Sequence, residues 1–328
     1  MQAAYYERTG AARDVLQLAV LPDPMPDAGE VRVRLRWSGV NPSDVKSRAG
    51  LRSTTLPFAR IVPHSDGMGV IDAVGVGVAP DRIGQRVWIW NATWGRAFGT
   101  AAQYVVLPEG QAVALPTGVS DEAGACLGIP ALTALHAVLA NGGVQGRSVL
   151  VAGGAGAVGH YAVQFARLLG ARQVLATVSS PKKAALAGAA GADTVIDYRS
   201  ENVAERVRQA TQGQGVDRII EVDIASNAAI DLEVIRTGGD CIVYGCDAAQ
   251  FSLPFRPLVV KNVTLNFFLV YTLNEQDRQR AVTTLTDFLQ RGALVHNIAE
   301  RLPLAHIAQA HELVEQGRTL GNVVLAIA

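Results

Sequence analysis

The chain has 328 residues, of which 49% are hydrophobic and 18% charged, and its 29 basic side chains balance its 29 acidic ones. This length predicts two folded domains, and the composition is that of a globular protein. A formal charge of zero gives no electrostatic reason to expect a nucleic acid partner. Because no apolar leader core follows Met1 and no apolar run is long enough for a membrane span, we expect a cytoplasmic protein.

The first 120 residues are rich in short strands. Residues 31–37 alternate between apolar side chains and the arginines Arg32, Arg34 and Arg36, which predicts a half-buried strand with a solvated basic face. Residues 70–74 and 86–90 are further short strands, separated by glycines and Pro80. Frequent turns between short strands favour a compact barrel-like domain over βαβ units.

The pattern changes after Ser120, which is placed to cap a helix running from Asp121 to Leu139. Short apolar strands then alternate with helical segments, and such alternation predicts a doubly wound parallel sheet. Pro181 is typical of a first helical position. The strands are expected at residues 148–152, 173–178, 194–197, 218–222 and 241–245.

The last part of the chain begins with residues 263–271, a strongly β-prone apolar run. An apolar strand at a sheet edge favours aggregation unless it is paired or covered, so we expect this strand to pair with a second subunit in a homodimer. Helices over residues 275–291 and 304–316 and a strand over 322–327 complete the predicted elements. The three cysteines, Cys126, Cys241 and Cys246, lack metal-binding spacing and are expected to be reduced and buried.

A glycine-rich turn is expected between the strand over 148–152 and the following helix. It reads Gly154-x-Gly156-x-x-Gly159, the dinucleotide-binding pattern in its required strand–turn–helix context. The glycines permit a tight turn, a close approach of backbone to pyrophosphate, and close packing of helix on strand. Unpaired amides at the helix start then point at the phosphates.

The residues at the end of the second parallel strand indicate whether the domain binds NADPH or NADH. An NAD-selective fold places an acid there, on the ribose 2′-hydroxyl, whereas this strand ends in Ser179 and Ser180, with Lys182 and Lys183 following. Lysine and serine attract a 2′-phosphate that a carboxylate would repel. We therefore predict NADPH, with surface lysines on a solvated helix as the alternative interpretation.

The chain resembles the zinc-free quinone oxidoreductase (zeta-crystallin-like) branch of the medium-chain dehydrogenase/reductase superfamily. The resemblance is carried by Gly29-Glu-Val-Arg-Val-Arg, Ser38-Gly-Val-Asn-Pro-Ser-Asp44, residues 63–69, Leu132-Thr-Ala134, the glycine-rich turn, Asp197-Tyr198 and Ala310-His-Glu312. It implies a GroES-like β-rich catalytic domain over residues 1–120 and 272–328. A doubly wound Rossmann domain that binds NADPH is implied over residues 121–271.

The resemblance also bears on metal binding. Zinc-dependent members carry Cys at the place of Asn41 and His at the place of Ser65, and they have a four-cysteine structural cluster that this chain lacks. His64 is one position out of register, and we expect it to form local hydrogen bonds instead. No metal site is predicted, and a zinc-dependent alcohol dehydrogenase is disfavoured.

Most predicted site residues follow from the same resemblance. Lys183, Tyr198 and Ser179 are implied to contact the 2′-phosphate, and Asn41 and Lys46 fall on the active-site loop as the candidate catalytic residues. The implied cofactor contacts are Asn41, Lys46, Thr133, Gly154, Ala155, Gly156, Ala157, Val158, Gly159, Ser179, Lys183, Tyr198, Gly245, Cys246, Phe268, Leu269 and Val270.

The predicted reaction is hydride transfer from NADPH to a quinone, because the arriving electron pair then moves onto an oxygen that a donor can stabilise. Lys46 replaces the tyrosine of several quinone reductases and is similar to the lysine that contacts the nicotinamide ribose in enal and enone reductases. Reduction of α,β-unsaturated carbonyls is therefore one alternative, and a non-enzymatic, crystallin-like NADPH-binding protein is another. Trp90, Trp94 and Phe98 form either a lid over the acceptor or part of the core.

Overall fold

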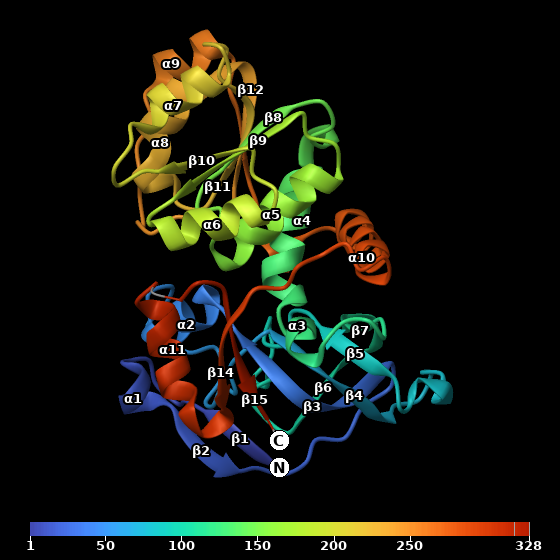
Figure 1. Ribbon diagram of the computed structural model, residues 1–328. Helices are drawn as coiled ribbons and strands as arrows, with labels where there is room; N and C mark the ends of the chain where they lie inside the picture. The colour runs from blue at the N-terminus through green and yellow to red at the C-terminus, as the bar shows by residue number, and fades with distance from the viewer. Residues whose placement is uncertain (318, 328) are drawn as a thin grey trace. The chain divides into compact units, whose positions relative to one another are not determined.

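The computed structural model describes residues 1–317 and 319–327. It divides into two compact units, a first unit of Met1–Pro130 and Thr286–Ala328 and a second unit of Ala131–Leu285. Both ends of the chain lie in the first unit (Figure 1). The sequence predicts domain boundaries after residues 120 and 271, whereas the structure changes from one unit to the other after Pro130 and after Leu285. The first boundary lies after Asp121 because the carboxylate of Asp121 accepts hydrogen bonds from Arg36 and Arg86 and so belongs with the first unit.

The first unit is built around a long central strand, β3. Its valines and Leu35 are buried while Arg34 and Arg36 are exposed, which confirms the alternation seen in the sequence. The sheet order is β14-β15-β3-β4-β5-β7, with β6 also paired to β3, and β1 and β2 form a separate two-stranded sheet. The strands are β1 (Gln2–Tyr5), β2 (Gln17–Val20), β3 (Glu30–Val40), β4 (Asp66–Val74), β5 (Arg86–Ile89), β6 (Tyr104–Pro108), β7 (Ala112–Ala114), β14 (Ile298–Pro303) and β15 (Asn322–Ala326).

The described residues of the first unit form four short helices, and 3₁₀ turns connect its strands. The C-terminal helix begins later than expected, because Leu304–His306 is a 3₁₀ turn that precedes it. The helices are α1 (Ala12–Val15), α2 (Pro42–Ala49), α3 (Asp121–Gly124) and α11 (Ile307–Glu315), and the other 3₁₀ turns are Pro80–Arg82 and Glu109–Gln111.

The second unit is the predicted doubly wound parallel sheet. Its strand order is β10-β9-β8-β11-β12-β13, with every neighbouring pair parallel. Helices α4, α5 and α6 lie on one side of the sheet and α7, α8 and α9 on the other (Figure 1). The strand order reverses between β8 and β11, which is where open α/β sheets bind their ligands. The strands are β8 (Ser148–Val151), β9 (Gln173–Val178), β10 (Thr194–Asp197), β11 (Val216–Glu221), β12 (Ile235–Val243) and β13 (Thr264–Phe267).

Two helices, one in each unit, begin at the residues that the sequence predicts. Ser120 and Ser180 both accept a backbone N–H with their hydroxyls, as caps of α3 and α6. Among residues 1–317 and 319–327, none of the helices combines the length and the apolarity that crossing a membrane requires. The helices of the second unit are α4 (Leu132–Leu139), α5 (Ala157–Leu168), α6 (Pro181–Ala189), α7 (Val203–Ala210), α8 (Ile224–Val234), α9 (Phe255–Lys261) and α10 (Glu275–Gln290), with 3₁₀ turns at Ala140–Gly142 and Val270–Thr272.

Two further predicted elements differ from the structure in extent. The single helix expected over residues 121–139 is broken into α3, a π-helical turn at Leu127–Ala131, and α4. Pro130 lies inside the turn and has no backbone N–H to continue an α-helical ladder. The strand expected over residues 263–271 is limited to β13, because a 3₁₀ turn follows at Val270–Thr272.

A buried ion pair connects three elements of the second unit. Arg218 of β11 is fully buried, and its Nε donates to Asp240 of β12 at 2.8 Å. Its Nη1 donates to the carbonyl oxygen of Val138 in the last turn of α4 at 3.0 Å. Asp240 is 6% exposed, so both charges lie away from water and depend on each other.

Candidate functional site

The glycine-rich turn of the second unit follows β8 and leads into α5. Gly156 is the N-cap of this 12-residue helix, and as a glycine it contributes no side-chain cap to the first amides. Gly153 has a φ of +69°, a left-handed conformation that side chains disfavour. The backbone amides at this helix start are therefore exposed to any anion that approaches the turn.

Three glycines of the turn have different physical roles. A Cβ on Gly159 would lie 2.1 Å from the Gly153 carbonyl oxygen, and one on Gly154 would lie 2.6 Å from Ala176 Cβ in β9. These two glycines permit close packing of turn, helix and strand. A Cβ on Gly156 would meet only the Gly153 oxygen, at 3.3 Å, so its outer side is open. A dinucleotide fits this turn, because its pyrophosphate needs an uncovered backbone next to a helix N-terminus.

The carboxyl end of β9 gathers the three residues predicted to contact a 2′-phosphate. Lys183 Nζ donates to Ser179 Oγ at 3.0 Å. Tyr198 follows the neighbouring strand β10, its amide donates to the Val178 carbonyl at 3.0 Å, and its side chain is 52% exposed. A hydroxyl, an ammonium and an exposed phenol ring thus adjoin one strand end, and β9 itself ends without a carboxylate.

An open cavity of about 460 Å³ lies at the carboxyl ends of β12 and β13. A Cβ on Gly245 would lie 2.0 Å from the Val222 carbonyl oxygen, so the chain after β12 passes against the chain after β11. Four of the predicted nicotinamide-side residues line this cavity, and they are Gly245, Cys246, Phe268 and Leu269. Val270 is 4% exposed.

Helix α4 contacts the same strand end. The ring of His136 lies 4.5 Å from that of Phe268, centroid to centroid. Thr133 lies three residues earlier on α4 and is 4% exposed. Its contact with a cofactor stays a prediction.

In the first unit, the predicted active-site loop places Asn41 between two buried carboxyl groups. The Asn41 amide N–H donates to Asp44 Oδ2 at 2.9 Å, and its side-chain Nδ2 donates to Asp66 Oδ2 at 2.8 Å. Burial raises the pKa of Asp44 to about 7 and raises the pKa of Asp66 well above its usual value. Asn41 is therefore held rigidly, and burial favours the protonated form of both acids.

Lys46 lies one turn further along α2 and is half-buried, and its predicted role as a ribose contact or proton source stays a prediction. The sequence assigned no role to Asp66. The only signal available was an acid at the start of a mostly apolar strand, β4. Exposure does not decide whether the aromatic residues of the loop form a lid or part of the core. Trp94 and Phe98 are 45% and 47% exposed, and Trp90 is half-buried.

A chain of buried hydrogen bonds runs behind this loop. Ser38 Oγ lies 2.8 Å from His64 Nδ1, and His64 Nε2 lies 2.9 Å from His311 Nε2 on α11. Both imidazoles are fully buried, and burial lowers the pKa of His64 to about 3 and that of His311 well below its usual value. His64 is thus the hydrogen-bonding residue that the sequence predicts.

Known proteins resemble this chain over most of its length. Residues 27–117 match the family model for an alcohol dehydrogenase GroES-like domain, and residues 157–290 match the model for zinc-binding dehydrogenases. A Pseudomonas aeruginosa quinone oxidoreductase is 30% identical over 325 residues, covering 95% of each chain. A Burkholderia 2-haloacrylate reductase is 29% identical over an alignment of 335 residues, covering 99% of this chain and 98% of its own.

Solved structures match over nearly the whole chain. An NAD-dependent alcohol dehydrogenase superposes with a TM-score of 0.89 at 30% identity and covers all of both chains. A mycobacterial protein complexed with NADPH has a TM-score of 0.87 at 28% identity and covers 99% of both. The chain belongs to the medium-chain dehydrogenase/reductase superfamily. Within it, the chain falls in the quinone oxidoreductase branch and is a quinone oxidoreductase-like reductase.

The zinc in the name of one family model does not fit the residues of this chain. A catalytic zinc takes three protein ligands, whereas the resemblance described above implies that Asn41 and Ser65 stand where zinc-dependent members carry cysteine and histidine. The ring nitrogens of His64 face Ser38 and His311. Across the described part of the chain, no group of three or more His, Cys, Asp or Glu is placed to hold a metal ion.

The buried histidine pair predicts a specific pH dependence of stability. Because the folded state keeps His311 neutral while the unfolded chain binds a proton below about pH 6.5, this residue lowers stability as the pH falls below 6.5. The variant His311→Gln keeps a hydrogen-bonding partner for His64 but does not titrate. Its unfolding free energy, measured in urea, should rise relative to wild type by about 1.4 kcal/mol per pH unit below 6.5. A difference that stays constant from pH 7 to pH 5 would contradict this assignment.

Proposed function

We propose that this protein is an NADPH-dependent, zinc-free quinone oxidoreductase that transfers a hydride from NADPH to a quinone. The observation that carries the choice of cofactor is the pairing of Lys183 with Ser179 at a β9 end that lacks a carboxylate. A 2′-phosphate placed there would accept from the ammonium and the hydroxyl. The names of relatives support the reaction, since quinone oxidoreductases of several organisms match over most of the chain.

Each part of the second unit has a defined task toward the cofactor. The amides from Gly154 to Gly159 bind the pyrophosphate, and Lys183, Ser179 and Tyr198 bind the 2′-phosphate. The β12 and β13 ends, with Gly245, Cys246, Phe268, Leu269 and Val270, hold the nicotinamide end, and Thr133 contacts it from α4. NADPH, when bound, supplies the hydride, and the protein supplies orientation and charge stabilisation.

The first unit contributes the groups that face the acceptor. Negative charge develops on an acceptor oxygen as the hydride arrives, and a fixed donor lowers the energy of that state. Asn41 is such a fixed donor, because Asp66 holds its side-chain amide and Asp44 its backbone amide. Lys46 contacts the nicotinamide ribose, or donates to the oxygen as a second, positively charged donor. Quinones and enones need no Lewis acid for this step, in contrast to the alcoholate of an alcohol dehydrogenase.

Reduction of an activated C=C bond is the second candidate function. Lys46 favours it, as does the similarity to a 2-haloacrylate reductase, whose named substrate is an activated alkene. A third candidate, binding of NADPH without turnover, would leave the same cofactor contacts in place and differ only in the absence of an accepted substrate.

The proposed protein acts as a homodimer through the outer edge of β13. This strand is last in its sheet, and Phe267 is 53% exposed on it. The neighbouring helix α9 exposes Phe255, Val259 and Val260 by 79%, 57% and 69%. An uncovered strand edge beside exposed apolar side chains is stabilised when a second copy covers both.

The dimer is tested by molar mass in solution. Wild type should give twice the chain mass by light scattering, and Phe267→Asp should shift the protein towards monomer because a carboxylate would be buried at the interface. Val76→Asp is the matched control, since Val76 is 83% exposed in a turn of the first unit. A monomeric wild type would refute the proposal.

The cofactor assignment is tested by reversing the charge at Lys183. Lys183→Glu should weaken NADPH binding by about a hundredfold or more and leave NADH binding within a few-fold, because only NADPH carries the 2′-phosphate. Fluorescence titration with both cofactors measures this. Lys182→Glu makes the same charge change one residue away and should have the smaller effect. Equal loss for both cofactors, or no loss, would contradict the phosphate pocket.

The acceptor is identified by following NADPH oxidation with a panel of small quinones and a panel of 2-alkenals and enones. Turnover on quinones is expected, and Lys46→Met should lower kcat/KM by about tenfold or more. Turnover on enones alone would replace the proposed reaction by the second candidate. Tight NADPH binding without turnover on either panel would support the third.

A further inference from the structure

Two buried carboxyl groups of the second unit lie against each other. Glu221 ends β11 and is fully buried, Asp231 lies on α8 and is 6% exposed, and the two carboxyl groups are close enough to share a proton. Glu221 Oε1 accepts from the Asp223 amide and, at 2.9 Å, from Asn227 Nδ2. Glu221 Oε2 and Asp231 Oδ2 are also buried, and within the described structure no N–H or O–H group donates to either. A proton shared by the two carboxyl groups is what satisfies both oxygens.

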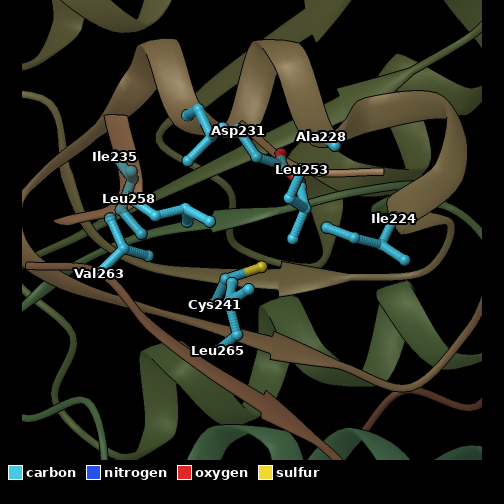
Figure 2. Close-up of a pocket in the computed structure, with 10 residues that line it drawn as sticks. Ile224, Ala228, Asp231, Ile235, Cys241, Leu253, Leu258, Val263 and Leu265 are labelled. Atoms are coloured by element: carbon cyan, nitrogen blue, oxygen red, sulfur yellow. The ribbon is translucent and has the colours of Figure 1, made fainter. Parts of the chain in front are cut away.

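The surroundings of Asp231 keep that proton in place. Burial, followed by the charge of Glu221, raises the pKa of Asp231 to about 9. Figure 2 shows Asp231 beside a cavity of about 10 Å³, roughly the space of one water molecule. Its walls are almost entirely apolar and are formed by Ile224, Ala228, Leu232, Ile235, Cys241, Leu253, Leu258, Val263 and Leu265.

The turn between β11 and α8, which Glu221 begins, contacts the chain after β12. The Glu221 carbonyl accepts from Tyr244 N at 3.1 Å, and Ile224 N donates to the Gly245 carbonyl at 3.3 Å. Asp247 N donates to Asp223 Oδ1 at 2.9 Å. The Val222 carbonyl fills the space that a side chain on Gly245 would need.

The same turn reaches the glycine-rich turn, because Val222 Cγ1 lies 3.6 Å from the position of a Cβ on Gly153. We propose that Asp231 is a positioning residue for the cofactor, which acts by sharing a proton with Glu221 and so holding the β11–α8 turn against Gly245 and Gly153. This inference rests on the proposed function, since both glycines belong to the proposed NADPH site. Loss of the proton leaves two carboxylates in one apolar pocket, and their repulsion moves the turn.

Other titratable groups near this pair do not replace its proton. Asp223 on the turn adds a further negative charge, and the Cys241 thiol of β12 and the Tyr244 phenol keep their protons because burial raises both pKa values. The cations of the adjoining helices bind other groups. Arg208 of α7 pairs with Glu233, and Lys261 of α9 donates to the carbonyls of Leu232, Glu233 and Ile235.

The test is the pH dependence of NADPH affinity, measured by fluorescence titration from pH 7 to pH 10. If only the protonated pair is competent, the wild-type Kd should rise about tenfold by pH 10, where about one-tenth of Asp231 remains protonated. Asp231→Asn keeps a donor towards Glu221 and should show a clearly smaller rise in Kd than wild type over this range, because both proteins share the remaining titrating groups of the cofactor site. Asp231→Leu keeps the bulk but donates nothing, and should bind NADPH more weakly at every pH. Glu233→Gln, a matched charge change on the exposed side of α8, should keep the wild-type profile.

A second measurement separates this inference from the proposed function. A carboxyl group whose pKa is raised by folding makes the folded protein less stable as the pH rises from about 4 to about 9. The melting temperature of Asp231→Asn should therefore increase relative to that of wild type across that range. No NADPH binding at pH 7, together with this gain, would refute the proposed cofactor and leave the shared proton standing. NADPH binding with a wild-type Kd that does not change up to pH 10, or with equal profiles for wild type and Asp231→Asn, would overturn the positioning role. Absence of the stability gain would overturn the shared proton itself.

Discussion

The close approach of three backbone segments at the glycine-rich turn is the constraint on which the second unit depends. A Cβ on Gly159 would lie 2.1 Å from the Gly153 carbonyl oxygen. A Cβ on Gly154 would lie 2.6 Å from the Cβ of Ala176 in β9. Any Cβ at either place would separate α5 from the sheet by more than a packed interior tolerates. The helix start, the β8 end and the β9 end are consequently brought to one point. The amides that face a pyrophosphate and the residues that face a 2′-phosphate are neighbours for this reason.

Patterns local in the sequence predicted much of this arrangement. Strands β9 and β10 occupy the predicted residues, and the alternation in β3 gave its buried and exposed faces. These predictions succeed because strand periodicity and glycine turns reflect short-range geometry. The long helix over residues 121–139 failed at Pro130, since apolar periodicity continues through the residue that interrupts the hydrogen-bond ladder. The predicted strand over 263–271 failed for a similar reason, because β-prone composition does not mark where pairing with β12 ends.

The contacts that the sequence could not reveal are those between residues far apart in the chain. His64 and His311 are separated by 247 positions, and the side-chain bond from Asn41 to Asp66 spans 25. Each of these residues is unremarkable in its local context, and only the pairing of β3 with β4 and the docking of α11 bring them together. Resemblance to a family did identify Asn41 as an active-site residue, but it gave no physical reason for its rigidity. That reason is the pair of carboxyl groups around it.

The Arg218–Asp240 pair has a consequence for how this protein can change over time. Loss of Asp240 would leave Arg218 buried without a counter-ion, and loss of Arg218 would leave Asp240 only its longer, 3.4 Å pairing with Arg147, so a single substitution at either position is expected to be selected against. Two apolar residues of similar volume could fill the same space, since the pair is not required for burial as such. The two positions are therefore expected to vary together among relatives, or not at all. Arg218 also donates to the carbonyl oxygen of Val138. A change at the Arg218–Asp240 pair is therefore expected to affect the end of α4 as well.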